Sequence, residues 1–305
     1  MTAAAARRAR AQAQAILGQL LGRAPRGLRA LGGGLSNHVF QARHGTDTFV
    51  IRLNDEPGKV KDYLKEQWAM AAARAQGVPV PEVLEVGAAP IPFMVSRSVR
   101  GEEATHHRRR RAVLRSLGGL LRRVHAVPTS GFGQTFDWSG NLLSRRESWA
   151  EYLQREYRGE ERIAALRRHG VLEEAQARRL RATLREVAKW EVEPALSHGD
   201  PRLKNVLADA EGTVTALLDW EFCTSHAAPW WDLSLALHDL SVDAKEALLE
   251  GYGLSPAEVR ERSPALRLFN VLNYAAAAGK AAKEKDKAAL GWIGARLAGA
   301  LDLYG

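Results

Sequence analysis

Apolar residues recur with helical spacing through much of the second half of the chain. The clearest stripe is Val113, Leu114, Leu117, Leu120, Leu121 and Val124. This spacing places all six side chains on one helix face. Charge-rich helices are also predicted over residues 145–158 and 172–190, and apolar stripes predict two C-terminal helices over 265–275 and 289–301.

Residues 31–100 show a different pattern, in which short apolar runs alternate with turns. A glycine-rich turn leads into a strand that ends near residue 40, and the β-branched run at 48–53 predicts its neighbour. A helix is predicted over 62–76, because Gly77 follows it as a stop signal. Two more short strands are predicted at 83–86 and 93–95.

One hairpin interrupts the helical half of the chain. Two apolar runs within residues 206–219 flank the sequence Asp-Ala-Glu-Gly, which is typical of a turn. We therefore predict an α+β fold with two lobes. A small β-rich lobe spans residues 1–100 and begins with a leading helix over 1–27, and a mostly helical lobe spans 101–305.

Residues 1–22 have two interpretations. They are rich in Ala and Arg, and no acidic residue precedes Asp47, as is typical of organellar targeting segments. They also fit an amphipathic helix with one apolar face: Ile16, Leu17, Leu20 and Leu21. We favour the helix because the signals of a folded domain begin directly after it. A secretory signal is not expected, since no long apolar segment follows the arginines.

Composition excludes several classes of protein. With 46% hydrophobic and 26% charged residues in 305, the chain is unlike a disordered, collagen-like or disulfide-scaffold protein. The single cysteine, Cys223, cannot form an internal disulfide, so we expect a reducing, cytoplasmic location. No apolar stretch approaches the roughly 18 residues of a membrane span, so no membrane partner is expected.

The net charge of +9 is unevenly distributed. Residues 1–125 hold 21 Lys and Arg against 9 Asp and Glu, whereas residues 126–305 hold 23 against 26. Such a basic half is typical of a nucleic-acid-binding protein, and equally of a lobe that binds phosphate groups of a ligand. Arg outnumbers Lys by 34 to 10 in an Ala-rich chain, which also indicates a codon bias. Composition leaves these alternatives open.

The residues that flank the hairpin carry the candidate chemistry. His198-Gly-Asp-Pro-Arg-Leu-Lys-Asn205 precedes it, and Asp219-Trp-Glu221 follows it. A hairpin returns Asp219 to the neighbourhood of Asn205, close to Asp200. Two carboxylates and an amide oxygen are ligands that Mg²⁺ prefers. Phosphoryl transfer requires such a set, since one carboxylate orients the attacking hydroxyl and the other groups hold metal on the phosphates.

These motifs and their order resemble a known family. The spacing from Asp200 to Asn205, followed by Asp219, is that of the protein-kinase catalytic loop and metal-binding Asp. With HGD and DWE in place of HRD and DFG, the chain resembles the aminoglycoside phosphotransferase and choline kinase family. Six further segments match in order: LGGGLSNHVF, FVIRL, VPVPEVLEVG, PFMVSRSVRGE, RRVHAVP and APWWDLSLAL. The resemblance covers residues 30–240 and implies a protein-kinase-like fold that uses ATP or GTP and Mg²⁺.

The resemblance also implies roles around the catalytic loop. Asp200 corresponds to the base or hydroxyl-orienting group, and Arg202 to a contact with the transferred phosphate. Asn205 and Asp219 correspond to magnesium ligands. Glu221 has three interpretations, namely a second metal ligand, a contact to a cationic substrate, or a solvated charge.

In the N-terminal lobe the resemblance implies a nucleotide site. Its glycine-rich loop supplies Gly32, Gly33, Gly34 and Ser36. Arg52 takes the place of the phosphate-contacting Lys of protein kinases, with Glu66 as its counter-ion. Backbone groups of Ser96 and Ser98 are expected to bind the base at the hinge.

Other features have a structural interpretation. We expect His198 to be a buried residue that holds the loop, and Asp232 to support the loop by hydrogen bonds. Trp230 and Trp231 suit an aromatic cage for a cation, but core packing is favoured. The basic run over 106–111 is interpreted as a solvated run at the entry to a helix.

The leading functional hypothesis is a kinase that phosphorylates a hydroxyl of a small molecule. The alternatives are a protein Ser/Thr kinase-like enzyme and a nucleic-acid-binding regulatory pseudokinase. The substrate stays open between aminoglycosides, sugars and amino alcohols. Residues 141–190, which the resemblance places near the pocket, hold 12 Lys and Arg against 8 Asp and Glu. This excess of basic residues does not favour a polycationic substrate. Oligomeric state is not predicted.

Overall fold

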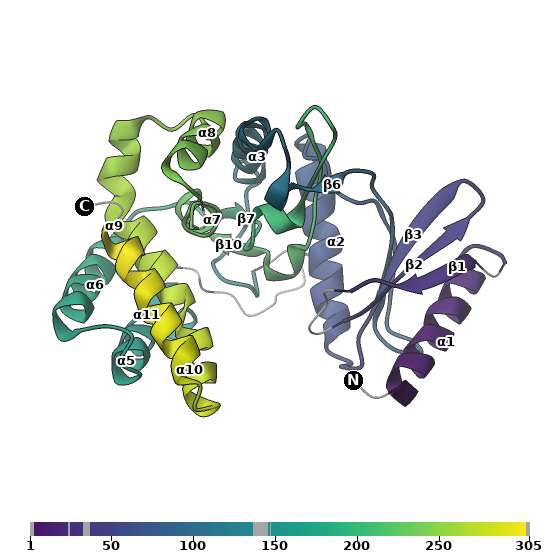
Figure 1. Cartoon of the computed structure of the whole chain (residues 1–305), viewed down its shortest axis with the longest axis horizontal. Coiled ribbons are helices and arrows are strands. Elements are labelled where there is room, and N and C mark those ends of the chain that lie inside the picture. Colours follow the sequence, from purple (N-terminus) through teal and green to yellow (C-terminus); the bar gives the residue numbers. More distant parts are fainter. Residues whose placement is uncertain are drawn as a thin grey trace.

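The computed structural model has two lobes, and the described residues are 3–23, 25–32, 37–136, 146, 148–238 and 240–302. A β-sheet with helices at its sides forms the N-terminal lobe, and helices dominate the C-terminal lobe (Figure 1). Because both predicted lobes are present, the α+β fold class is confirmed. The domain boundaries stay a prediction. No helix of the described ranges is long and apolar enough to cross a membrane.

The N-terminal lobe is built on five antiparallel strands in the order β1-β2-β3-β5-β4. The strands are β1 (Arg26–Ala30), β2 (His38–His44), β3 (Asp47–Leu53), β4 (Val83–Gly87) and β5 (Phe93–Arg97). Helix α1 (Ala3–Leu20) lies beside the sheet, and helix α2 (Lys59–Ala75) lies between the sheet and the other lobe (Figure 1).

Strand β3 shows how alternation divides the sheet into two faces. Phe49, Ile51 and Leu53 are buried in one cluster with Ile16 and Leu17 of α1. The leading helix therefore contributes to the core of the N-terminal lobe, as the apolar stripe predicts. Arg52 lies between two of these residues and points to the opposite face, because successive side chains of a strand alternate.

The C-terminal lobe contains nine helices within the described ranges, together with short strands and single turns of 3₁₀-helix. The longer helices are α3 (Arg110–Val124), α4 (Trp149–Arg155), α5 (Gly159–Arg168), α6 (Glu174–Val187), α7 (Trp230–Ala236), α8 (Val242–Tyr252), α9 (Pro256–Asn273), α10 (Ala275–Lys283) and α11 (Lys287–Asp302). The strands are β6 (Glu102–Glu103), β7 (Ala195–Ser197), β8 (Val206–Ala208), β9 (Val214–Leu217) and β10 (Thr224–His226). The short turns are η1 (Ala104–His106), η2 (Leu203–Asn205) and η3 (Trp220–Phe222).

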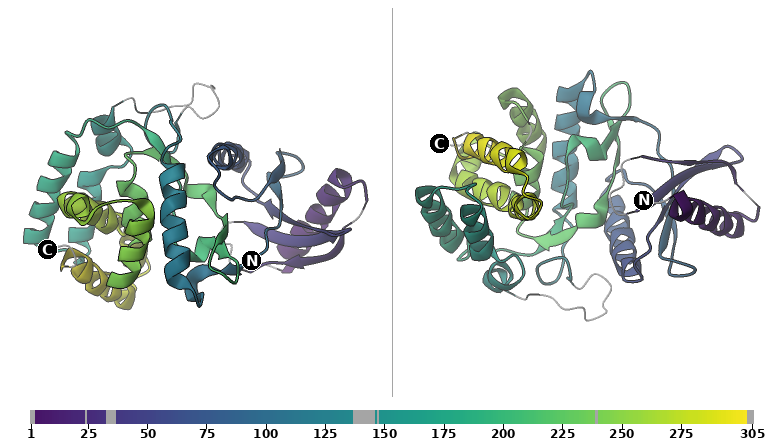
Figure 2. Two further views of the ribbon diagram at one scale, coloured as in Figure 1. Left: turned by 90° about the horizontal axis from the view of Figure 1, so that it is seen from above. Right: turned by 60° about the horizontal axis from the view of Figure 1, so that its bottom comes forward.

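Two glycines allow α3 and α8 to pack backbone to backbone. A Cβ atom on Gly118 would overlap the carbonyl oxygen of Leu248, and one on Gly251 would overlap the carbonyl oxygen of Arg115. Close approach of the helices therefore requires both glycines, despite their low helix propensity. Helix α8 lies beside α3 in two views (Figures 1 and 2).

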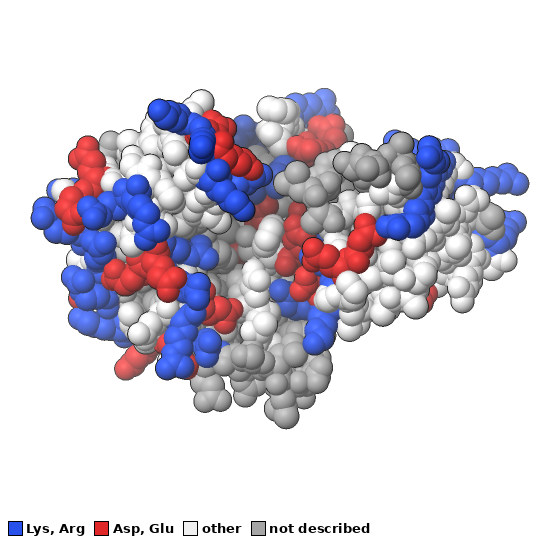
Figure 3. All heavy atoms as spheres, turned by 90° about the horizontal axis from the view of Figure 1, so that it is seen from below, with Lys and Arg blue, Asp and Glu red and all other residues white. Residues whose placement is uncertain are grey.

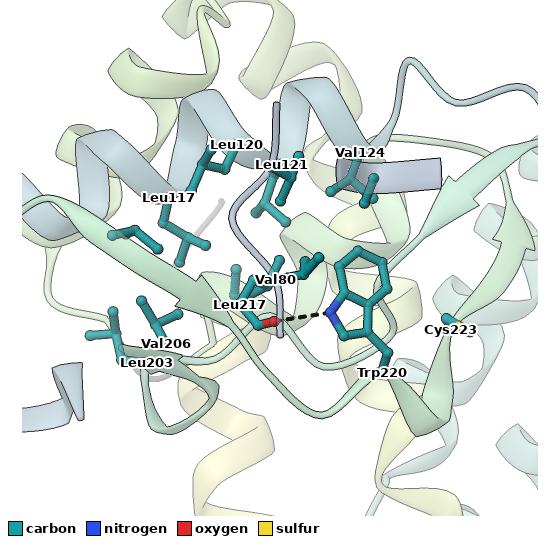
Figure 4. Close-up of a cluster of buried hydrophobic side chains, with 14 of the residues drawn as sticks. Val80, Leu117, Leu120, Leu121, Val124, Leu203, Val206, Leu217, Trp220 and Cys223 are labelled. Atoms are coloured by element: carbon teal, nitrogen blue, oxygen red, sulfur yellow. Dashed lines mark hydrogen bonds between the residues drawn. The ribbon is translucent and has the colours of Figure 1, made fainter. Parts of the chain in front are cut away.

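The core of the C-terminal lobe anchors the residues after Asp219. Trp220 is fully buried, and its indole Nε1 donates a 3.0 Å hydrogen bond to the carbonyl oxygen of Leu217. Figure 4 shows its ring among side chains of α3 and the hairpin, including Leu121 and Val124. This packing fixes the backbone on both sides of Trp220.

Several elements differ from the sequence predictions. The helix predicted over 145–158 is α4, which starts at Trp149, and residues 137–145 and 147 lie outside the described ranges. Helices α5 and α8 and strands β1, β7 and β10 were not predicted. Strands β7 and β10 have three residues each, so their pairing depends on tertiary contacts rather than on a local pattern.

Candidate active site

The catalytic loop leaves strand β7 and is held by a buried carboxylate. Asp232, at the start of α7, accepts backbone N–H bonds from His198 at 2.7 Å and Gly199 at 2.8 Å. The Nε2 atom of His125 lies 3.0 Å from the same carboxylate. The structure therefore confirms that Asp232 supports the loop. Gly199 has a φ of +87°, and a Cβ there would overlap the carbonyl oxygen of Phe222, so this turn requires glycine.

His198 lies inside the loop and uses both ring nitrogens there. Its Nε2 is 2.9 Å from the carbonyl oxygen of Leu218, and its Nδ1 is 3.2 Å from the amide nitrogen of Asp200. A neutral ring satisfies both contacts, since Nε2–H donates and Nδ1 accepts. Burial lowers the pKa of His198 and favours this form. The prediction that it is a buried scaffold residue is confirmed.

Asp200 is 4% exposed and faces two cations. Arg202 binds it in a bidentate ion pair, with Nη2 2.8 Å from Oδ2, and the Lys204 ammonium lies 3.1 Å from the same oxygen. Burial alone would raise the pKa of Asp200, but the two cations outweigh it and lower the pKa below its ordinary value. Arg202 therefore neutralises Asp200 here, whereas its predicted phosphate contact stays a prediction.

The hairpin brings the predicted magnesium ligands to one end. Val206 of β8 pairs with Leu217 of β9, and the amide of Leu218 donates a 2.8 Å hydrogen bond to the carbonyl oxygen of Asn205. Asp219 follows directly, with a φ of +63°. The Asn205 Nδ2 donates to the carbonyl oxygen of Asp200 at 2.9 Å, so its side-chain oxygen stays available to a metal.

This donor set fits magnesium bound together with nucleotide phosphates. Among the described residues, no group of three or more His, Cys, Asp or Glu side chains could hold a metal by itself. Mg²⁺ is commonly held by one or two protein oxygens plus phosphate oxygens and water. The Asp219 carboxylate and the Asn205 amide oxygen match that pattern.

Charged side chains from both lobes meet beside Asp219. The Arg52 guanidinium binds Glu66 of α2, with Nη1 2.5 Å from Oε2, so the predicted pairing is confirmed. The Oε2 atom of Glu221 lies 3.9 Å from Nη2 of Arg52 and 3.7 Å from the ammonium nitrogen of Lys59. Lys59 also pairs with Asp62 at 3.1 Å. Glu221 thus links β3 and α2 to the segment after the hairpin.

The nucleotide residues of the N-terminal lobe are only partly described. Gly33, Gly34 and Ser36 lie outside the described residues. Gly32 directly precedes them, and a Cβ atom added to it would contact none of the described residues. Ser96 lies in β5 between its two neighbouring strands, and the Ser98 amide already donates to the carbonyl oxygen of Thr48 at 2.8 Å. The Ser98 amide is therefore already hydrogen-bonded, whereas the binding of a base by other backbone groups of Ser96 and Ser98 stays a prediction.

A pocket of about 620 Å³ opens at Asp200 on the C-terminal lobe. Its volume suits a small molecule. Aromatic side chains of α4, α7 and η3 and of the segments after α4 and before α10 form much of its wall: Tyr152, Tyr157, Phe222, Trp231 and Tyr274. Trp231 packs against His226 and Phe269, as the core prediction implies, but it also lines this pocket.

Sequence reasoning missed two cations and the pocket. Lys204 lies within the HGD segment, so its spacing of four residues from Asp200 is a usable signal. Lys59 precedes the predicted start of α2 by three residues and was therefore not placed near the site. The pocket residues come from distant segments, and no local pattern connects them.

The sequence and the fold are similar to those of known phosphotransferases. The model of the phosphotransferase enzyme family (APH) matches residues 27–266. A search of curated proteins found no match. Among solved structures, aminoglycoside phosphotransferase APH(4)-Ia is 20% identical with a TM-score of 0.68, over 95% of this chain and 97% of that one. Macrolide 2'-phosphotransferase MphH from Brachybacterium faecium is 18% identical with a TM-score of 0.65, over 94% and 97%. At these identities the likeness establishes a shared fold.

Proposed function

The chain belongs to the phosphotransferase enzyme family, and we propose that it transfers the γ-phosphoryl group of ATP or GTP to a hydroxyl of a small molecule, with Mg²⁺. The family match covers most of the chain and includes every predicted catalytic residue. A related fold has been solved as a ternary complex with AMP-PNP and hygromycin B. That complex supports a nucleotide and a small acceptor bound together.

The position of Asp200 carries this proposal. Asp200 lines the pocket, and its backbone carbonyl oxygen accepts a hydrogen bond from the side chain of Asn205, the residue directly before strand β8 of the hairpin. An acceptor hydroxyl in the pocket would therefore meet Asp200 next to the metal-binding residues. Asp200 would orient this hydroxyl and accept its proton.

The remaining groups stabilise charge on the nucleotide. Asn205 and Asp219 would hold Mg²⁺, which neutralises charge on the phosphates when it is bound. Arg52 would bind phosphate oxygens, because Glu66 holds its guanidinium in place. Lys59 adds a second cation on the same side. Most of the rate enhancement would come from this positioning and electrostatic stabilisation.

The protein-kinase alternative conflicts with the short segment after Asp219. Between Asp219 and Trp230 the chain forms η3 and β10, and β10 pairs with β7. A peptide-binding activation loop has no room in this segment. Nucleic-acid binding gains no support from the face shown in Figure 3, where Lys and Arg are interspersed with Asp and Glu over much of the C-terminal lobe. The buried Cys223 is consistent with a reducing, cytoplasmic location.

Magnesium-dependent ADP release tests the proposal. Purified protein is assayed against hydroxyl compounds, with Asp200→Asn and the exposed control Asp243→Asn alongside. We expect an acceptor-stimulated signal that Asp200→Asn abolishes and Asp243→Asn retains, while both variants still bind ATP. Wild-type turnover in Asp200→Asn would remove Asp200 from the mechanism. Absence of any Mg-ATP effect on the melting temperature would overturn the kinase assignment.

A further inference from the structure

The charged groups of the pocket are not equally compensated. Asp200 and Arg202 pair with each other, and Glu156 accepts a hydrogen bond from the Gln134 amide at 3.0 Å. Arg162 also lines the pocket, and within the described ranges no carboxylate lies within 4.0 Å of it. It is therefore a pocket cation without an acidic partner in the part of the chain that the structure describes.

Backbone carbonyls and an aromatic ring hold the Arg162 guanidinium. Its Nε donates to the carbonyl oxygen of Tyr157 at 2.7 Å, and its Nη1 donates to that of Leu272 at 3.3 Å. The guanidinium carbon lies 4.4 Å from the centre of the Tyr157 ring. These contacts use two of the five N–H groups, so the others can bind a ligand in a fixed orientation.

The wall beside Arg162 is rich in hydrogen-bond donors. Four pocket residues hold a donor group that is shielded from solvent and has no partner among the described residues: the Tyr157 hydroxyl, the Thr224 hydroxyl, the Trp231 indole N–H and the Asn273 amide. The two hydroxyls can donate or accept, whereas the Trp231 indole N–H and the Asn273 NH₂ group can only donate, so the wall as a whole favours a ligand that brings acceptor atoms. Apart from Asp200, Glu156 is the one carboxylate among the described lining residues.

We propose that the acceptor substrate carries an anionic oxyacid group, a carboxylate or a phosphate ester, and that Arg162 binds this group. The inference rests on the proposed function and specifies its substrate class. An oxyanion matches the guanidinium fork and brings acceptor atoms to the donor-rich wall. A polycationic substrate would instead place ammonium groups against Arg162, with Glu156 as a single counter-charge. Arg162 therefore determines specificity by binding, and Asp200 remains the group at the reacting hydroxyl.

The test uses matched ligands that differ in one group. Glucuronate, glucose 6-phosphate, glucose and 6-amino-6-deoxyglucose share one ring, and three-carbon and five-carbon hydroxy acids are paired with their alcohols and amines. Affinity for the full chain with Mg-AMP-PNP is measured by calorimetry, and ADP release by a coupled assay. We expect the oxyanion forms to bind at least tenfold more tightly than the amines. The carboxylate and phosphate members identify which oxyanion is preferred.

Variants distinguish binding from a structural role. Arg162→Gln is expected to reduce the preference for oxyanions at least tenfold, through KM rather than kcat, and Arg162→Lys to recover part of it. Arg168→Gln, an exposed arginine on the same helix, is the control and should change nothing. If Arg162 serves only to hold carbonyls of the fold, Arg162→Gln lowers the melting temperature and affects all ligands equally, which would overturn the proposal.

The wild-type preference provides a measurement that does not depend on any variant. If no oxyanion compound binds more tightly than its amine counterpart, the proposal is wrong, whichever compounds are phosphorylated. Failure of the proposed function has a different signature, because Mg-ATP would then leave the melting temperature unchanged.

Discussion

Replacing Asp232 by Asn tests whether one buried carboxylate positions the catalytic loop. The carboxylate receives three contacts, at 2.7, 2.8 and 3.0 Å, from His198, Gly199 and His125. An amide keeps the shape but turns an NH₂ group toward one of these donors. A hydrogen bond to a charged group contributes about 1.5–3 kcal/mol, and an unsatisfied buried amide costs a similar amount. We therefore expect Asp232→Asn to lower the free energy of unfolding by about 3 kcal/mol.

Two measurements check this expectation. A loss of this size lowers the melting temperature by about 5 °C in a chain of this length. The kcat should fall at least tenfold, because Asp200 follows His198 by two residues and a displaced base reacts slowly. The exposed Asp243→Asn serves as the matched control. A variant Asp232→Asn with wild-type melting temperature and kcat would refute the positioning role.

The same carboxylate predicts a pH dependence. Burial would raise the pKa of Asp232, but the contacts with His125, His198 and Gly199 outweigh it and lower the pKa below its ordinary value. A depressed carboxyl pKa stabilises the folded state above the unfolded pKa of about 4, and this contribution is lost as the pH falls through the folded value. The stability difference between wild type and Asp232→Asn should therefore be largest near pH 7 and shrink below pH 4.

Three further substitutions address the N-terminal lobe. Arg52→Gln should raise the KM for ATP at least tenfold, because it removes a phosphate contact. It should also lower the melting temperature, because it leaves the buried Glu66 without its cation. An unchanged KM would exclude the phosphate contact. Lys59→Gln should raise the same KM by about threefold to tenfold, for a partly screened charge, whereas the exposed Lys61→Gln should not. Leu17→Ala should destabilise the protein by about 2–5 kcal/mol in denaturant unfolding, because Leu17 is fully buried against the sheet; wild-type stability would show that α1 is dispensable.

The catalytic loop could be predicted because its chemistry is local in sequence. Asp200 and Asn205 belong to one segment, and the turn within 206–219 identifies the hairpin that returns Asp219. The pairing of Arg52 with Glu66 was implied by the family resemblance, whereas the sequence alone left Glu56 and Asp62 as other possible counter-ions; the structure selects Glu66. Local patterns therefore determine both the order and the proximity of the catalytic-loop groups.

Elements that depend on tertiary packing could not be predicted. Gly118 and Gly251 are poor helix formers by sequence, yet they bring α3 and α8 into contact. Strand β10 has three residues and exists because β7 lies beside it. Backbone groups of Ser96 and Ser98 are expected to bind a base, but the Ser98 amide donates to the carbonyl oxygen of Thr48, which extends the strand pairing by one residue.

The pocket shows why bulk charge is a poor guide to substrate choice. Residues 141–190 hold 12 Lys and Arg and 8 Asp and Glu, but among the described ones only Glu156 and Arg162 line the cavity. Several of the other charged side chains form surface pairs, such as Arg167 with Glu174, and these have little effect on a ligand. If Arg162 binds an oxyanion as proposed, selectivity between cationic and anionic acceptors would depend mainly on these two side chains, because Asp200 and Arg202 pair with each other. Because one substitution at either position changes the balance of charge, the same fold can serve acceptors of opposite charge.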